Sequence, residues 1–273
     1  MNYYFAGAEK KDVYLMLKDV GVKKALFSFY GMSNKVKRNF WSLSKIFTHI
    51  MIDSGAFTFI AGNKKVKENE IDDLVIEYGN WLKSNKDYFN HYVEMDVDSV
   101  LGYPKVLEYR KYLEGCTGIP CMPCWHIMRG IENWRELSKQ YQYIALGGLA
   151  IHELRKPERY IPTLLSMAHQ NNCKVHGMGY TKFQYLKTYP FDSVDSTYWL
   201  KSSIYGDYYV FVDNRMEKAK RGGLKNLGRL SKIHHSLHNL KQFKAYADYL
   251  EKYWESKTIS NDGKNIPGKK RNY

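Results

Sequence analysis

Short β-rich runs alternate along this chain with amphipathic stretches, a pattern typical of βα units around a parallel sheet. Eight runs read as strands, at 3–8, 25–29, 48–53, 91–97, 119–127, 141–146, 173–178 and 192–196. Helices are expected at 9–20, 70–84, 104–114, 131–140, 157–171 and 181–188, whereas 30–47 contains no clean helical pattern. Eight such strands predict an α/β fold, a (β/α)8 TIM barrel over residues 1–200.

The chain after residue 200 departs from this alternation. Residues 208–212 read as an inserted strand, and 215–232 then carries seven cations against the single acid Glu217. We expect 201–256 to form a basic insertion and a closing helix, at about 236–256, of the same domain. The polar stretch 257–273, which ends in Lys269-Lys270-Arg271-Asn272-Tyr273, is expected to be a disordered basic tail.

The charge balance points to a polyanionic partner. Lys and Arg number 42 against 28 Asp and Glu, a formal net charge of +14, and cations that neutralise phosphates release condensed counterions. No apolar run approaches the roughly 20 residues that cross a bilayer, so no membrane partner is expected. The N-terminus lacks the pattern of a secretory signal and the four cysteines are too sparse for a disulfide scaffold, which favours a cytoplasmic location.

Acids and paired glycines stand where several predicted strands end, and the carboxyl ends of barrel strands build the active site. Asp53 ends the third strand, and Asp96 and Asp98 end the fourth. Cys124-Trp125-His126 ends the fifth, and Gly147-Gly148 ends the sixth. Capping and turn formation would explain any one of these residues. Asp195 ends the eighth strand, so together they place the three carboxylates of Asp53, Asp96 and Asp195 around one mouth.

Four of these segments resemble the tRNA-guanine transglycosylase superfamily. They are Asp-Ser-Gly-Ala-Phe at 53–57, Ile-Ala-Leu-Gly-Gly-Leu-Ala at 144–150, Gly-Met-Gly at 177–179 and Asp-Ser-Val-Asp at 192–195. The opening Tyr-Phe-Ala-Gly-Ala-Glu and the strand end Met-Asp-Val-Asp look closest to the DpdA-like DNA-guanine transglycosylases of phages and bacterial islands. The resemblance implies a pentosyltransferase that exchanges guanine in DNA for a 7-deazaguanine such as preQ0 or a derivative, a modification linked to restriction evasion.

The resemblance also implies roles for individual residues. Asp195 matches the nucleophile that forms a covalent glycosyl-aspartate, and Asp53 matches the general acid/base. Asp96 matches the acid that reads the purine edge, and His126 stands where the family has a base-contacting glutamine. The remaining residues expected around the base are Gly147, Gly148, Ser54, Gly177 and Met178.

No cofactor and no metal are expected. The family's zinc site, built from three cysteines and a histidine, has no counterpart here, because no cysteine follows Cys173. Cys121, Cys124 and His126 offer a CxxC and a nearby histidine, but neighbouring side chains on a strand point to opposite faces, so barrel-core cysteines are the favoured interpretation.

DNA is the expected partner, held along its backbone by cations of the insertion. These are Arg215, Lys218, Lys220, Arg221, Lys225 and Arg229. The alternatives are a tRNA-directed transglycosylase and a non-catalytic nucleic-acid-binding paralogue, which the retention of Asp53 and Asp195 argues against. A small-molecule glycosidase shares the two carboxylates but leaves the charge unexplained. The host cytoplasm is expected if a phage encodes the chain, and the sequence does not indicate an oligomeric state.

Overall fold

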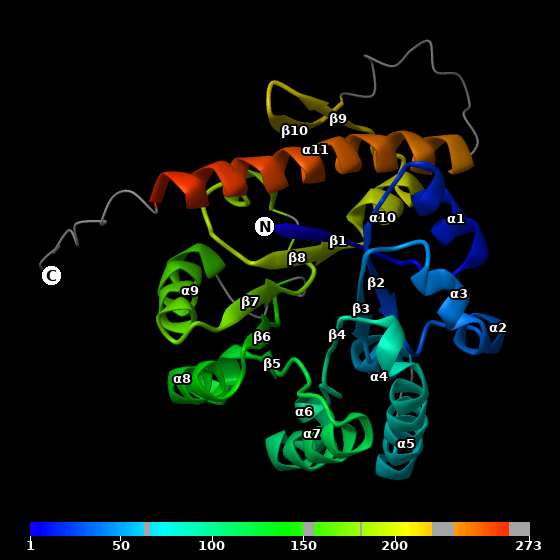
Figure 1. Cartoon of the computed structure of the whole chain (residues 1–273), viewed down its shortest axis with the longest axis vertical. Coiled ribbons are helices and arrows are strands. Elements are labelled where there is room, and N and C mark those ends of the chain that lie inside the picture. Colours follow the sequence, from blue (N-terminus) through cyan, green and yellow to red (C-terminus); the bar gives the residue numbers. More distant parts are fainter. Residues whose placement is uncertain (63–65, 150–155, 181, 220–231, 262–273) are drawn as a thin grey trace, which may run out of the picture.

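The structure is a computed structural model that describes residues 1–62, 66–149, 156–180, 182–219 and 232–261. Eight parallel strands form its centre, in the spatial order β4-β3-β2-β1-β8-β7-β6-β5 (Figure 1). Their bounds are β1 Asn2–Ala6, β2 Lys24–Ser28, β3 His49–Asp53, β4 His91–Tyr92, β5 Cys124–Trp125, β6 Tyr143–Leu146, β7 Lys174–Gly177 and β8 Ser193–Ser196. A parallel bridge from Val93 to Met122 joins the two ends of the sheet. The predicted α/β TIM-barrel-like fold is confirmed.

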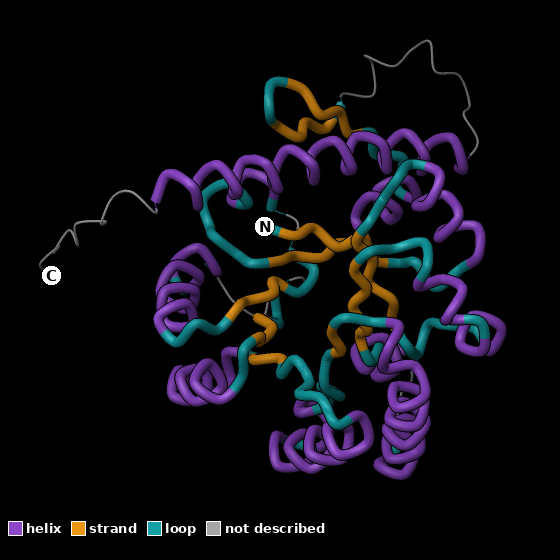
Figure 2. The backbone as a smooth tube through the Cα atoms, viewed as in Figure 1, coloured by secondary structure: helices purple, strands orange, loops and turns teal. Residues whose placement is uncertain are grey.

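Helices surround the strands, as Figure 2 shows. Those of the barrel are α1 Lys11–Asp19, α2 Asn34–Arg38, α3 Phe40–Ser44, α4 Ala56–Gly62, α5 Glu68–Asn85, α6 Asp98–Leu101, α7 Tyr103–Thr117, α8 Gly130–Gln140, α9 Ile161–Gln170 and α10 Tyr198–Ile204. Residues 30–47, without a clean pattern in the sequence, contain the short α2 and α3. In α5 the apolar residues spaced three and four apart are buried against the strands, as amphipathic spacing requires.

Strand alternation divides the core into an inner and an outer part. A small cluster fills the barrel interior: Tyr4, Ala6, Leu26, Met51, Val93, Met122, Cys124 and Ala145. Residues of opposite parity, such as Phe5, Ile52 and Trp125, belong to a larger cluster that includes helix residues. Because successive side chains on a strand face opposite ways, this parity indicates which residue at each strand end faces the barrel axis.

Three predicted elements differ from those observed. The strands expected at 91–97 and 119–127 shorten to β4 and β5, and Pro120 and Pro123 interrupt the second because proline has no N–H to donate. The helix expected at 181–188 is reduced to the 3-10 turn η4 Phe183–Tyr185. Carbonyl oxygens of Phe183 and Leu186 instead accept hydrogen bonds from Tyr246 and Trp254.

Both of those aromatic residues belong to α11 (Lys232–Asn261), which packs on α10 and β1 (Figure 1). The hairpin of β9 (Tyr209–Val212) and β10 (Arg215–Lys218) lies against α11, where Asn239 accepts a hydrogen bond from the Tyr209 N–H at 3.0 Å. Residues 257–261 of the expected tail belong to α11, and 262–273 lie outside the described residues. Within the described residues, no helix combines the length and apolar character needed to span a membrane.

Candidate active site

A cavity of about 240 Å³ lies at the carboxyl ends of the strands, the end that bears the active site in barrels of this kind. Seven of the sequence-predicted site residues line it: Asp53, Ser54, Asp96, His126, Gly147, Gly148 and Met178. A Cβ at Gly177 would point toward Phe191 and Tyr180 of the outer core, so Gly177 faces away from the cavity. Asp195 is buried, and Gly179, which donates to it, belongs to the cavity lining. The structure thus gathers nearly all of the predicted set.

Asp53 ends β3 with its side chain on the barrel axis, two residues after the interior Met51. The Gly55 N–H donates to its Oδ2 at 3.1 Å. Burial, then the negative charge of Asp195, raise the pKa of Asp53 to about 7. A carboxyl group with this pKa exchanges its proton near neutral pH, which is what a general acid/base requires.

Gly55 makes this turn possible. Its φ is +79°, and a Cβ there would fall 2.5 Å from Ser28 Oγ and 2.7 Å from Tyr30 Cβ. A glycine is therefore required both by the backbone conformation and by the close approach of the loop after β2. The Asp-Ser-Gly sequence follows from this need for a turn as much as from any chemistry.

Asp195 lies in β8 with its side chain only 10% exposed. Its Oδ1 accepts the Gly179 N–H at 2.6 Å and faces His176 Nε2 at 3.2 Å. His176 Nδ1 lies 2.5 Å from Ser193 Oγ, which also contacts the Tyr143 hydroxyl. One set of roles satisfies this chain, in which Tyr143 donates to Ser193, Ser193 to Nδ1, and Nε2–H to Asp195. These bonds fix the carboxylate in place.

His176 and Tyr143 were not among the predicted site residues. The sequence held a signal for both, because His176 precedes Met178 by two residues and Tyr143 precedes Ala145 by two. Residues two apart on a strand share a face, and Ala145 belongs to the interior cluster that Tyr143 and Met178 contact.

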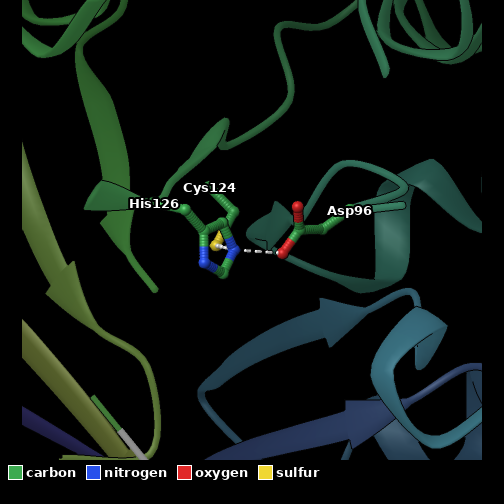
Figure 3. Close-up of side chains that lie close together, drawn as sticks. All are labelled: Asp96, Cys124 and His126. Carbon is green, nitrogen blue, oxygen red and sulfur yellow. Dashed lines mark hydrogen bonds and ion pairs between the residues drawn. The ribbon is translucent and has the colours of Figure 1, made fainter. Parts of the chain in front are cut away.

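Asp96, Cys124 and His126 form a compact group on the opposite side of the mouth (Figure 3). His126 Nε2 lies 2.5 Å from Asp96 Oδ2 and 3.6 Å from Cys124 Sγ. Burial alone would lower the pKa of His126, but Cys124 and Asp96 outweigh it and raise that pKa to about 12. Burial and the charge of Asp96 raise the pKa of the Cys124 thiol, also to about 12. Cys124 and His126 share a face because they are two residues apart, whereas Cys121 belongs to the outer core.

Arg129 anchors this side of the mouth and was not predicted. Its guanidinium, 2% exposed, pairs with Asp98 at 2.7 Å, with Asp96 at 3.0 Å and with Glu94 at 3.2 Å. Glu94 is fully buried and also pairs with Arg110 at 2.6 Å. Paired and hydrogen-bonded charges of this kind tolerate burial that a lone charge does not.

Two of the cations predicted to hold a DNA backbone are described by the structure. Arg215 and Lys218 belong to β10, and Lys218 pairs with Asp207 at 2.7 Å. Neither residue lines the cavity that Asp53 lines. Lys220, Arg221, Lys225 and Arg229 lie outside the described residues.

The chain matches no protein-family model, and no curated protein matches it in sequence. Solved structures do match its fold. The YdjI aldolase from Escherichia coli K12 is 10% identical over 92% of this chain and 89% of its own, with a TM-score of 0.50. A 4-hydroxy-2-oxoglutarate aldolase/2-deydro-3-deoxyphosphogluconate aldolase from TTHB1 is 11% identical over 90% of this chain and 92% of its own, with a TM-score of 0.45. At such identity the likeness concerns the fold.

These matches correct the family expectation. YdjI, whose fold this chain resembles, is named as an aldolase and not as a transglycosylase, and no family model matches the chain, so the assignment to the tRNA-guanine transglycosylase superfamily is wrong. The predictions that depended on it are therefore wrong as well: guanine exchange in DNA or tRNA, the pentosyltransferase class and the nucleic-acid-binding paralogue. The physical reason is that an acid at a strand end and a glycine after it serve turns and caps in any βα barrel. Four short segments of this kind therefore resemble several barrel families at once.

Proposed function

We propose that this protein is an enzyme that moves a proton to or from a small polar molecule held in the barrel mouth, with Asp53 as the proton-exchanging group. One observation carries the proposal. Asp53, from β3, faces the cavity of about 240 Å³, and Asp195, from β8, lies behind the Gly179 that lines the same cavity. Two carboxyl groups on different strands thus meet at the end of the barrel where enzymes of this fold work.

The two carboxyl groups differ in how they are held. Asp195 receives a backbone N–H and faces a histidine whose other nitrogen is also engaged. Asp53 receives the N–H of Gly55, and its pKa of about 7 follows from burial and from the charge of Asp195. Environments that separate two carboxyl groups in this way assign them different tasks. Asp195 is held in place by its hydrogen bonds, and Asp53 gains and loses the proton.

Aldol cleavage is the first reaction to test, because it needs one group that takes and returns a proton. Asp53 as carboxylate removes the hydroxyl proton of a β-hydroxy carbonyl compound. The O–H electron pair becomes the new C=O bond, the Cα–Cβ bond breaks, and its electrons form an enolate. The enolate carbon then recovers the proton from Asp53, which returns to its starting state. YdjI, named as an aldolase, has the same barrel architecture.

Proton exchange can be measured without knowing the natural substrate. The full-length protein is incubated in D2O with a panel of 2-oxo acids and hydroxyketones, and deuterium entering the carbon next to the carbonyl is followed by NMR. We expect incorporation with the wild type, and a loss of about 100-fold or more in Asp53→Asn, the usual contribution of a general base. Asp19→Asn, an exposed acid at the end of α1, is the matched control. Absence of exchange across the panel, or equal exchange in Asp53→Asn, would reject the proposal.

A further inference from the structure

We infer that Asp96, Cys124 and His126 form a binding site for one divalent transition-metal cation, best suited to zinc. The inference goes beyond the proposed proton transfer and does not depend on it. One ligand atom from each residue lies within 4.8 Å of the other two (Figure 3). A thiol, an imidazole and a carboxyl group therefore already face one point.

The fold brings these ligands together from two strand ends. Cys124 begins β5 and His126 follows that strand, so both project into the barrel. Asp96 follows β4, and the bridge from Val93 to Met122 sets the two segments side by side. The ligands thus come from both sides of the point where the sheet closes on itself.

The ligand set favours one class of metal. Thiolate and imidazole are ligands that zinc accepts readily, with a carboxylate as an accepted third, whereas magnesium and calcium take oxygen ligands. Three protein ligands leave one tetrahedral position of zinc open, the arrangement of a catalytic rather than a structural site. All three residues line the cavity that Asp53 lines. The open coordination position of the metal would therefore face a molecule held in that cavity.

Neighbouring residues hold the ligands in orientation, as residues that hydrogen-bond to the ligands do in metal sites. Arg129 takes Asp96 by Oδ1, which leaves Oδ2 turned toward His126. The Cys124 backbone N–H donates to Glu94 Oε1 at 2.8 Å, and its carbonyl accepts from Arg129 at 2.5 Å.

Gly147, from the loop after β6, leaves the space that these ligands occupy. A Cβ there would lie 2.7 Å from His126 Cε1 and 2.8 Å from Cys124 Sγ, so any larger residue would push the ligands apart. Gly147, one of the two glycines that the sequence suggested for base binding, thus has a direct role in spacing the ligands.

Binding is an exchange of protons for the cation. The Cys124 thiol and the His126 Nε2 each release a proton to solvent, and the sulfur and nitrogen lone pairs then bind the metal. The contact between His126 Nε2 and Asp96 Oδ2 is replaced by bonds to the metal of about 2.0–2.2 Å, with about 2.3 Å to sulfur.

The test uses the full-length protein after chelator treatment and dialysis, titrated with Zn²⁺ and separately with Co²⁺. We expect one equivalent to bind, and Co²⁺ to give a thiolate-to-cobalt charge-transfer band. Cys124→Ser should abolish that band and weaken binding at least about 100-fold, beyond the 10–100-fold typical of residues behind the ligands. Cys173→Ser, a buried free cysteine next to β7, is the matched control and should bind like the wild type.

A second variant covers the case in which Cys124→Ser fails to fold. Asp96→Asn, whose side chain is 22% exposed, should keep the cobalt band while weakening binding about 10-fold or more. No stoichiometric binding by the wild type, or a cobalt band that persists in folded Cys124→Ser, would overturn the inference. These readouts need no turnover, so failure of the proton-exchange assay leaves them intact, and their failure leaves that assay intact.

Discussion

The β3–β8 side and the β4–β5 side of the barrel mouth shift the pKa of their carboxyl groups in opposite directions. Both hold carboxyl groups away from water. On the β3–β8 side, burial and then the negative charge of Asp195 raise the pKa of Asp53, although the Gly55 N–H that donates to it opposes them. On the β4–β5 side, burial would raise the pKa of Asp96, but His126 and Arg129 outweigh it and lower that pKa. The difference shows that positive partners, and not depth alone, decide whether a carboxyl group in this mouth keeps its proton.

Removing the central cation should break the β4–β5 side. Arg129→Met leaves Glu94, Asp96 and Asp98 without their shared partner, and breaking a buried pair of this kind costs about 3–5 kcal/mol. Urea denaturation should show this loss in the free energy of unfolding. Arg135→Met is the control, because Arg135 pairs with the exposed Glu132 and should lose about 0–1 kcal/mol. Equal losses in the two variants would show that the buried network adds nothing.

The β3–β8 side should respond to pH through Asp53. Its folded pKa of about 7 lies above the ordinary value of 3.8, so between these values the folded state binds more protons than the unfolded state, and stability falls as pH rises. The surrounding groups are Asp195, Asp96, Glu9 and the Gly55 N–H. About three pKa units at 1.36 kcal/mol each, discounted for the partly exposed site, give a loss of about 2–3 kcal/mol from pH 4 to pH 8.

Asp53→Asn should remove this fall in the free energy of unfolding between pH 4 and pH 8. Urea denaturation of Asp53→Asn and of Asp19→Asn at both pH values isolates the contribution of Asp53. The wild type and Asp19→Asn should weaken together as pH rises, while Asp53→Asn changes less. A wild type that gains as much stability from pH 4 to pH 8 as Asp53→Asn would place the pKa of Asp53 near its ordinary value.

The smallest expected effect is on stability, and it tests how tightly the turn after Asp53 packs. Gly55 and Gly21 have φ of +79° and +78°, but a Cβ at Gly21 meets nothing within 4 Å. Alanine at Gly21 should cost about 1 kcal/mol for the backbone conformation alone. Alanine at Gly55 should cost about 1–2 kcal/mol more, because it also displaces Ser28 and Tyr30. Thermal unfolding of the two variants measures the difference, and equal costs would mean that the loop after β2 yields freely.

The sequence predicted the barrel and most of the mouth because both depend on local patterns. Alternation and strand-end acids marked Asp53, Asp96 and Asp195 without any knowledge of pairing. The sequence did not predict the role of Arg129, because that role depends on ion pairs with three acids that reach it only when β4 and β5 lie side by side. The helix expected at 181–188 failed for a similar reason, since α11, far along the chain, takes its carbonyl groups. The family resemblance failed because its motifs are also those of turns.

The place where the barrel closes has a consequence for how the molecule moves. Neighbouring pairs such as β2–β3 or β6–β7 share ladders several residues long, but β4 and β5 are joined through the bridge at Val93 and Met122. The Arg129 contacts span the same gap. Transient local opening should begin there, because few backbone hydrogen bonds must break. The N–H groups of Glu94 and Met122 donate across this gap to the carbonyls of Met122 and Tyr92. Their amide protons should then exchange with solvent sooner than those of β2 and β3, and any ligand that bridges Asp96 to His126 would slow them.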